Sequence, residues 1–513
     1  MAVTIDMMLK NIGEFGHYQW FLTCLLGYCL LAVSAFNTMI VAFIAVEPDW
    51  KCVGGYMNNT VCRFNTTITL TSNEYKARCN MPRKAWTFVD DFTSIVTEYD
   101  LVCDNSILLS VAQSCFWAGM LPCLVIGGYL SDKYGRRIVI ISGIYLAIIA
   151  SLIIVFPKSL IVFIVFRIFI GFGGGLANSS SYPLVTEFTT GRYRPWIGNG
   201  YFLFWMFGLM ILPLIAYFVR GWRMLLLTTV VCGVPSLLLT WLLPESPRWL
   251  MLNKKEKEAK NQLLKIAEMN KKLLPDGDLK RPVILEQQAR FSQLFSSWRM
   301  AATTLICWDL WFTVALVYYG VSFSTGDLGG NRYLSFFFIG LVGAFSLFAS
   351  LWAVHRFGRK KSVVVGLVIT VIASVISVAI PSDRSPVNVG AQVAAAIVAN
   401  FFISFSFGGM YLWTVELFPT VIRSIGMSTS SAFGRVGSFS ASYIIWLIRI
   451  HAALPYGIMG AIALQAAVLA LFLPETRGKA TLETMDDIKE QEDQGVVERD
   501  DKTKNNENME SKM

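Results

Sequence analysis

One arginine inside an apolar stretch is the residue of this chain with the clearest chemistry. Arg435 lies about 16 Å of helix rise beyond Ser424, in a segment long enough to cross a membrane. A charge at that depth is costly and usually faces a cavity, and a guanidinium can hold a carboxylate with two hydrogen bonds. We therefore expect Arg435 to bind an anionic group; the alternative is a structural arginine that donates to carbonyls of a neighbouring helix. Polar residues at spacings of four and three share its helical face: Ser424, Ser428, Ser431, Ser438 and Ser442.

The composition shows what kind of elements must position Arg435. Of the 513 residues, 54% are hydrophobic and 15% are charged, whereas a soluble domain carries about 25% charged residues. This much apolar surface needs lipid as its solvent, so the sequence predicts an all-α membrane protein. About twelve segments are long enough to cross a hydrocarbon core: 18–46, 105–130, 138–157, 159–185, 196–219, 224–243, 300–322, 332–354, 362–381, 389–413, 425–448 and 454–473.

The distribution of charge predicts the orientation of the chain. Basic residues gather in the short turns after the second and eighth segments and between Lys254 and Arg299. Because Lys and Arg mark the cytoplasmic side, both termini are expected inside the cell. The first 17 residues hold Asp6, Lys10 and Glu14 and no small-residue cleavage site, so no cleaved signal peptide is expected. The net charge of +9 gives no reason to expect nucleic acid as a partner; the expected partner is the lipid bilayer.

A set of short charged motifs occurs twice, roughly one half-chain apart. The first copy reads Gly-Tyr-Leu-Ser-Asp-Lys-Tyr-Gly-Arg-Arg over 128–137, and the second reads His-Arg-Phe-Gly-Arg-Lys-Lys over 355–361. Each copy is followed by a Glu/Arg pair seven residues apart and then by a Pro-Glu motif, at 244–248 and at 474–478. Repeated charged turns between long apolar segments are typical of a membrane transporter built from two halves.

The repeated charges are expected to pair at helix ends on the cytoplasmic face and to latch neighbouring helices. In the second copy His355 stands where the first has Asp132, so the second latch is expected to be weaker unless another acid substitutes. Topology alone, with positive residues holding loops inside, is a sufficient explanation for Arg359, Lys360 and Lys361. The residues expected to form the latches are Asp132, Arg136, Arg137, Glu187, Arg194, Glu416 and Arg423.

Three polar regions interrupt or follow the apolar segments. Residues 47–104 lie outside the cell in this topology, and their four cysteines predict two disulfides with three pairings open, against the alternative of free thiols. Residues 244–299 predict a cytoplasmic linker with short amphipathic helices between membrane units at 1–243 and 300–478. Residues 479–513 predict a disordered cytosolic tail. The cysteines are Cys52, Cys62, Cys79 and Cys103, and the glycosylation sequons of the outer loop are at Asn58 and Asn65.

Together the motifs resemble a known family. The turn at 128–137 is similar to the loop motif of the major facilitator superfamily. The large cysteine-bearing loop and the motifs at 98–103, 244–250 and 416–423 resemble the organic cation, anion and zwitterion transporters of solute carrier family 22, over residues 1–480. Sugar porters share the Pro-Glu motifs, but they lack this loop, so sugar transport ranks low. The resemblance implies the major facilitator fold, with twelve transmembrane helices in two six-helix bundles.

The resemblance also implies which residues line the binding pocket. The position of Arg435 tends to be basic in anion and zwitterion carriers of the family and acidic in several cation carriers. Leu347 stands where several anion carriers have lysine, which leaves carnitine-like zwitterions open. Aromatic walls suit large organic ions, although each aromatic residue is alternatively a packing residue. The expected pocket residues are Arg435, Tyr318, Tyr319, Phe407, Tyr411, Trp205, Asn37 and Gln113.

These features predict a plasma-membrane transporter that moves small organic ions by alternating access. They favour organic anions or zwitterions that carry a carboxylate, with organic cation transport as the alternative. A non-transporting receptor or scaffold and an ion channel are the alternatives from other classes, and a coupling or exchanged ion is an open question. The three histidines form no metal-binding or catalytic pattern, and no phosphate-binding loop is present, so no enzyme activity, metal or cofactor is expected.

Overall fold

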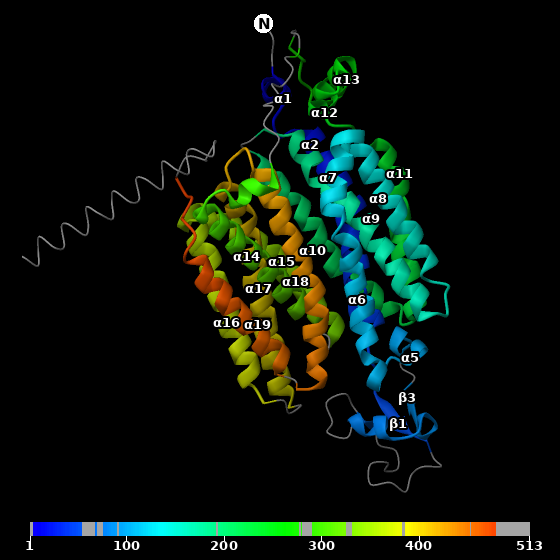
Figure 1. Cartoon of the computed structure of the whole chain (residues 1–513). Helices are drawn as coiled ribbons and strands as arrows, with labels where there is room; N and C mark the ends of the chain where they lie inside the picture. Colours follow the sequence, from blue (N-terminus) through cyan, green and yellow to red (C-terminus); the bar gives the residue numbers. More distant parts are fainter. Residues whose placement is uncertain are drawn as a thin grey trace, which may run out of the picture.

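The molecule consists of two helical bundles that lie side by side, with additional structure at both ends (Figure 1). This computed structural model describes residues 4–53, 67–68, 75–89, 92–190, 193–275, 279, 290–324, 331–381, 385–451 and 453–478. In that part of the chain, ten helical segments are long and apolar enough to cross a membrane. The 24-residue α18 (Arg423–Trp446) is not among them because its serines and arginine lower its hydropathy, and α19 (Leu454–Ala470) has only 17 residues. With these two, the segments number twelve.

The first bundle, called the N-half, contains the first six spans. Its first span is interrupted by the π-helical segment η1 (Gly27–Ala32) and by a turn at Ile40. Close to that turn, Nη1 of the buried Arg167 donates a hydrogen bond to the carbonyl of Asn37 at 2.8 Å. The other helices of the N-half are α2 (His17–Leu26), α3 (Val33–Met39), α4 (Val41–Ile44), α6 (Ile107–Met120), α7 (Cys123–Tyr134), α8 (Arg136–Ile153), α9 (Leu160–Glu187), α10 (Arg194–Phe218), α11 (Trp222–Leu239) and η6 (Thr240–Leu242).

The second bundle, called the C-half, contains the last six spans. Two of its helices begin with side-chain caps that satisfy otherwise unpaired backbone N–H groups. Asn331 accepts hydrogen bonds from two N–H groups at the start of α15, and Ser385 accepts one at the start of α17, which has Pro386 at its first position. The remaining bounds are α14 (Trp298–Ser324), α15 (Arg332–Phe357), α16 (Arg359–Ala379), α17 (Pro386–Leu417) and η9 (Leu447–Arg449).

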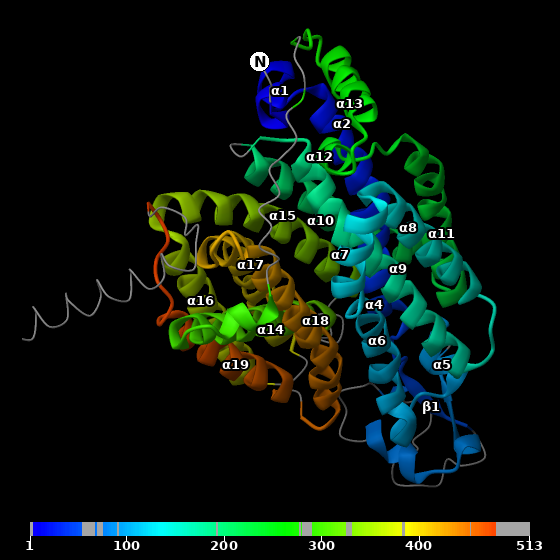
Figure 2. The ribbon, with the colours of Figure 1, turned by 45° about the horizontal axis from the view of Figure 1, so that its top comes forward.

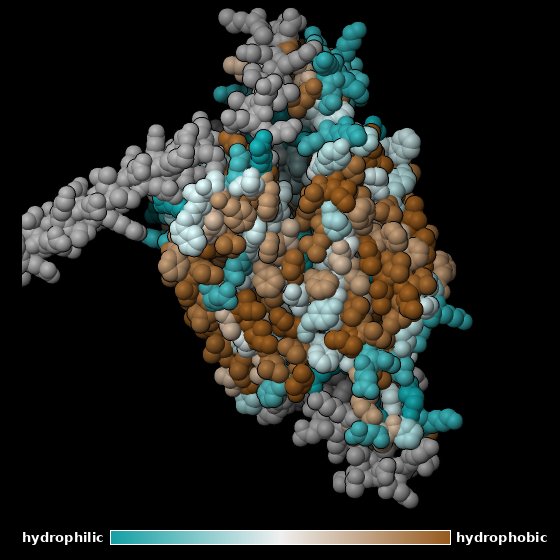
Figure 3. Space-filling model, in the orientation of Figure 1, coloured by the Kyte–Doolittle hydropathy of each residue, from teal (hydrophilic) through white to brown (hydrophobic). Residues whose placement is uncertain are grey.

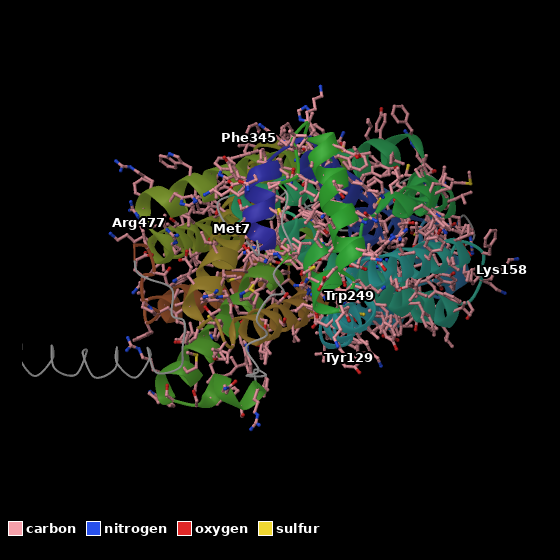
Figure 4. All side chains as sticks on the ribbon, turned by 90° about the horizontal axis from the view of Figure 1, so that it is seen from above. Met7, Tyr129, Lys158, Trp249, Phe345 and Arg477 are labelled. Atoms are coloured by element: carbon pink, nitrogen blue, oxygen red, sulfur yellow. A yellow bond between two sulfur atoms is a disulfide. The ribbon has the colours of Figure 1, made fainter. Side chains whose placement is uncertain are left out.

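The outer faces of the two bundles are apolar. Figure 3 shows a broad hydrophobic band across both bundles, with hydrophilic residues at the two ends. Phe345 points outward from α15, as Figure 4 shows, and its side chain is 64% exposed. Soluble proteins rarely expose so large an apolar surface, so this band is the surface that contacts lipid.

One end of the molecule, here called the linker end, carries three amphipathic helices. These are α1 (Ile5–Ile12), α12 (Pro247–Leu252) and α13 (Glu256–Met269), and α1 packs on α13. Asn270 joins them to the bundle, because its side-chain oxygen accepts from the N–H of Tyr18 and its amide donates to the carbonyl of Ile12. The 3₁₀ segment η7 (Phe291–Phe295) precedes the C-half. The linker helices are therefore fixed to the N-half.

The opposite end, here called the sheet end, carries a small antiparallel sheet of order β2-β1-β3. Cys79 and Cys103 form a disulfide there, and Cys52 is also disulfide-bonded. The predictions for Cys62, Asn58, Asn65 and the tail fall outside the described residues. The elements at this end are β1 (Trp50–Cys52), β2 (Thr67–Ile68), β3 (Trp86–Phe88), η3 (Tyr75–Asn80), η4 (Arg83–Ala85), α5 (Ile95–Tyr99) and η5 (Cys103–Ser106).

Candidate functional site between the two halves

Close contact between α14 and α18 sets the position of Arg435. A Cβ atom at Gly437 would lie 2.1 Å from the carbonyl oxygen of Phe312, so only glycine permits this approach. Arg435, two residues earlier, is half-buried, and its Nη1 donates to the carbonyl and the hydroxyl of Ser431 at 3.2 and 2.6 Å. Its Nε is buried without a hydrogen-bond partner among the described residues. The guanidinium therefore bonds its own helix and also interacts with the hydroxyl of Tyr411, while its Nε is unused.

Aromatic side chains of α14 and α17 pack into one cluster. Trp311 contacts Tyr411 at 4.6 Å and Phe407 at 5.7 Å between ring centroids, and Phe407 contacts Tyr411 at 5.3 Å. Tyr318 stacks on Phe407 at 6.4 Å and lies edge-on to Tyr319 at 5.0 Å. The structure thus brings together the four aromatic residues of the C-half that the sequence singled out, and it adds Trp311.

The N-half completes the cluster with three rings that cross the boundary between the halves. At this boundary α6 packs on α18 and α10 packs on α15 (Figure 2). Trp205 is where the sequence placed it, but Trp117 and Phe202 were missed. The crossing contacts are Trp205 Nε1 donating to the Tyr318 hydroxyl at 3.0 Å, Trp117 on Tyr319 at 4.5 Å and Phe202 on Tyr411 at 5.6 Å.

The guanidinium of Arg435 acts on two tyrosines of this cluster. The guanidinium interacts electrostatically with the hydroxyl groups of Tyr319 and Tyr411. The ion pairs recorded for the described residues do not include Arg435. The cluster therefore offers ring faces, which attract cations, next to an arginine whose charge no carboxylate neutralises. Such a site suits an organic ion that carries an ammonium group, a carboxylate group or both.

One predicted pocket residue, Asn37, lies apart from this centre. Asn37 is buried inside the N-half, where its side-chain oxygen accepts from Ser151 at 2.9 Å. It lines a small cavity together with Cys29 and Phe116, and the structure does not bring it to Arg435. Gln113 is half-buried on α6, one helical turn before Trp117.

At the linker end, the first copy of the repeated motif forms a latch within the N-half. Nη1 of Arg136 lies 2.5 Å from Asp132, and Nη2 lies 3.4 Å from Glu187 at the end of α9. The side chain of Arg137 donates to the carbonyl of Trp241 at 3.3 Å. This latch ties α7, α8 and α9 together.

The second copy also forms a latch, which uses the expected Glu416. Arg359 holds both carboxylate oxygens of Glu416, at 2.9 and 2.8 Å, and Thr476 donates to the same carboxylate at 2.5 Å. The acid comes from another helix, which is the case that the sequence left open for His355 in place of an aspartate. Topology alone is not a sufficient explanation for Arg359, because two N–H groups of its guanidinium bond Glu416.

Arg194 and Arg423 were expected to complete these latches; each interacts electrostatically with the glutamate seven residues before it, but neither has an ion pair recorded in the described residues. The glutamates seven residues before them pair with Arg136 and Arg359 instead. Each of the two arginines begins a helix, α10 or α18, and each has a buried Nε without a hydrogen-bond partner in the described part of the chain. The latches therefore form between spans of one half rather than within each Glu/Arg pair.

The glutamates of the two Pro-Glu motifs have a role that sequence reasoning missed, although their repetition was the available signal. Each caps the start of a helix by accepting two backbone N–H groups, as favoured at a helix N-terminus. Glu245 accepts from Arg136 at 2.9 Å and Arg137 at 3.2 Å, and Glu475 accepts from Arg359 at 2.9 Å and Lys360 at 3.1 Å.

The two caps differ in their electrostatics. Burial raises the pKa of Glu245 above its ordinary value, although backbone N–H groups favour the charged form. Burial acts the same way on Glu475, but four backbone hydrogen bonds outweigh it and leave its pKa below the ordinary value. The lowered pKa means that Glu475 contributes stability at neutral pH, and this contribution is lost as the pH falls through that pKa.

The glycines before these caps lead to a stability prediction. Gly135 and Gly358 have φ angles of +103° and +104°, and a Cβ atom at either would lie 2.3 or 2.5 Å from the capping carboxylate. We expect Gly135→Ala and Gly358→Ala each to lower stability by about 1–3 kcal/mol, because the backbone conformation is essentially restricted to glycine. Thermal unfolding in detergent measures this loss. Gly128→Ala is the control, since its Cβ would meet nothing within 4 Å; equal melting temperatures for all three variants would contradict the prediction.

Comparison with known proteins places this geometry in a family. The model of the family described as "Sugar (and other) transporter" matches residues 50–488. Solute carrier family 22 member 15 of Xenopus tropicalis is 30% identical over 490 residues, which cover 94% of this chain and 91% of that protein. This chain belongs to solute carrier family 22. The organic cation/carnitine transporter 2 of Homo sapiens is also 30% identical, over 94% of this chain and 93% of its own length. An organic cation transporter protein of Drosophila melanogaster is 29% identical, over 94% of both chains.

Solved structures agree on the fold. A partially occluded inward open structure of the xylose transporter XylE from E. coli superposes with a TM-score of 0.64 at 17% identity, over 90% of this chain and 99% of that one. XylE is a member of the major facilitator superfamily. The predicted all-α major facilitator fold is therefore confirmed. As a member of solute carrier family 22, the chain is a multi-pass membrane transporter of organic ions and not an enzyme.

Proposed function

We propose that this protein transports organic cations and carnitine-like zwitterions across the plasma membrane by alternating access. The observation that carries the proposal is the position of Arg435, which lies beside the aromatic cluster without an acidic partner among the described residues. A zwitterion with an ammonium group and a carboxylate uses both features at once. The ammonium lies against the rings of Tyr319, Phe407 and Tyr411, and the carboxylate meets the guanidinium.

The relatives support the cationic part of this substrate class. Two of them are named for organic cations, one of these also for carnitine. These names favour organic cation transport, which the sequence analysis gave as the alternative, over transport of organic anions, which it preferred. Arg435 then distinguishes zwitterions from simple cations, because a simple cation gains nothing from the arginine and is repelled by it.

The contacts between the halves support a transport cycle in which the substrate site is closed at the sheet end. There, Nε1 of Trp446 donates to Ser106 at 3.2 Å, and the hydroxyls of Tyr443 and Ser114 share a hydrogen bond of 3.0 Å. The ion pairs recorded at the linker end all lie within one half. The disulfide and the basic linker support an orientation with the sheet end outside the cell and the termini inside. The cycle then proceeds by opening the sheet end and closing the linker end.

Uptake into proteoliposomes tests the proposal. Four labelled probes are offered in parallel: a quaternary ammonium, a carnitine-like zwitterion, an aromatic carboxylate and xylose as the matched neutral control. We expect saturable uptake of the first two, with the lower KM for the zwitterion. Binding without net uptake would indicate a receptor, and unsaturable flux would indicate a channel; either result, or uptake of the carboxylate alone, would overturn the proposal.

A further inference from the structure

Glu47 is held between two arginines at the sheet end. Its side chain is 5% exposed, and its carboxylate pairs with Arg78, whose side chain is 2% exposed, and with Arg449, whose side chain is 23% exposed. The Nη2 of Arg449 lies 2.7 Å from Oε2 of Glu47, while Nη2 of Arg78 donates to Oε1. Three charges so far from solvent form a specific arrangement rather than a solvated surface pair.

These three residues come from three parts of the fold. Glu47 follows the first span, in the N-half; Arg78 belongs to η3, next to the disulfide cysteine Cys79; Arg449 lies in η9, which continues α18 of the C-half. Within the described residues, the pair of Glu47 with Arg449 is the ion pair that joins the two halves. The other recorded contacts that close the sheet end include neutral hydrogen bonds, ring contacts and the guanidinium of Arg332 over the ring of Phe92 at 5.5 Å.

We propose that Glu47 and Arg449 form the extracellular latch of the transporter, with Arg78 as its fixed support. The proposal rests on the alternating-access function given above. When the halves part at the sheet end, Arg449 moves away with α18, and Glu47 stays with the N-half. The attraction between these two charges is then lost and must be replaced by hydration, which makes the closed state more favourable than neutral contacts alone would.

Arg78 explains how the carboxylate tolerates the open state. Its guanidinium is held over the ring of Trp86 at 5.2 Å, and the neighbouring disulfide joins η3 to η5 at the start of the second span. It therefore remains with Glu47 when Arg449 leaves, so that the buried carboxylate keeps a cationic partner throughout the cycle. Arg449 also shares one continuous helical segment with Arg435, so the latch acts on the element that carries the proposed substrate contact.

The test measures how often the sheet end opens. Ser106 and Ser114 of the second span both contact α18, and Ser110, 5% exposed, lies one helical turn from each. Ser110→Cys is therefore a reporter that a membrane-impermeant thiol reagent reaches from outside only in the open state. The parent chain without the reporter gives the background from native thiols. The rate of labelling is measured on intact cells and normalised to the protein at the surface.

Four variants are compared in the reporter chain. Arg449→Gln and Arg449→Met remove the charge while Arg78 still pairs with Glu47, and each is expected to raise the labelling rate about fivefold or more. Arg449→Lys keeps the charge and is expected to label close to the parent rate. Arg83→Gln is the matched control, because Arg83 pairs with Asp100 in the same region, half-exposed and within one half.

The outcomes separate the latch from the proposed function. Parent-like labelling in both Arg449→Gln and Arg449→Met, in chains that still take up substrate, would overturn the latch alone. The same increase in Arg83→Gln as in Arg449→Gln would also overturn it, because a general loosening would then explain the result. Absence of uptake of every probe by the parent chain would instead overturn the proposed function.

Discussion

Arg435→Gln is expected to raise the KM for a carnitine-like zwitterion by about 10- to 100-fold, while the KM for a quaternary ammonium of similar size does not rise, because the repulsion by the guanidinium is removed. A hydrogen bond to a charged group contributes about 1.5–3 kcal/mol, and each 1.4 kcal/mol corresponds to tenfold. Glutamine keeps most of the side-chain volume and removes the charge and the fork. Initial uptake rates over a range of concentrations give both KM values.

Two further variants show whether this result depends on the geometry and the position of the arginine. Arg435→Lys keeps the charge without the bidentate geometry, and we expect a KM for the zwitterion between those of the parent and of Arg435→Gln. Arg167→Gln removes another deep arginine that lies in the N-half and donates to Asn37. It is expected to reduce the amount of folded protein without changing the ratio of the two KM values. Equal changes for zwitterion and cation in Arg435→Gln would mean that the arginine acts on structure and not on the carboxylate.

Tyr411→Leu is expected to weaken both ammonium substrates by about tenfold in KM, because a desolvated cation–π contact is worth roughly 1–2 kcal/mol. Tyr411 occupies the middle of the cluster, between Trp311, Phe407 and Phe202 of the other half. Tyr411→Phe keeps the ring face and is expected to retain most of the affinity. The same uptake assay measures all of these variants.

Phe345→Leu is the control for the loss of a ring. Phe345 points outward from α15 and is 64% exposed (Figure 4). The variant Phe345→Leu removes an apolar area similar to that lost in Tyr411→Leu, and no change in KM is expected. The aromatic site would be in the wrong place if Phe345→Leu and Tyr411→Leu changed KM alike.

The features that the sequence predicts correctly depend on local periodicity. The apolar spans and the polar face of α18 repeat with helical spacing, so they can be recognised without knowledge of the fold. Arg435 is found in this way because a charge deep in an apolar segment is rare. The two-halved architecture follows from the repeated motifs, and the fold class is confirmed by the solved structures.

The features that were missed depend on contacts between distant segments. Trp117 and Phe202 join the cluster only because α6 and α10 pack against the C-half, which no single helix pattern indicates. The second latch pairs Arg359 with Glu416, 57 residues away, so the sequence could list the glutamate but not its partner. Asn37 has the same local pattern as a pocket residue, but its neighbours Arg167 and Ser151 place it inside one bundle.

A structure of the protein with a bound carnitine-like zwitterion tests the central claim most directly. We predict that the ligand lies between the two halves, with its carboxylate within hydrogen-bond distance of Arg435 and its ammonium group against Tyr319, Phe407 and Tyr411. A ligand bound elsewhere would contradict this account, for example in the cavity of the N-half that Asn37 lines. So would a ligand between the halves with its carboxylate turned away from Arg435.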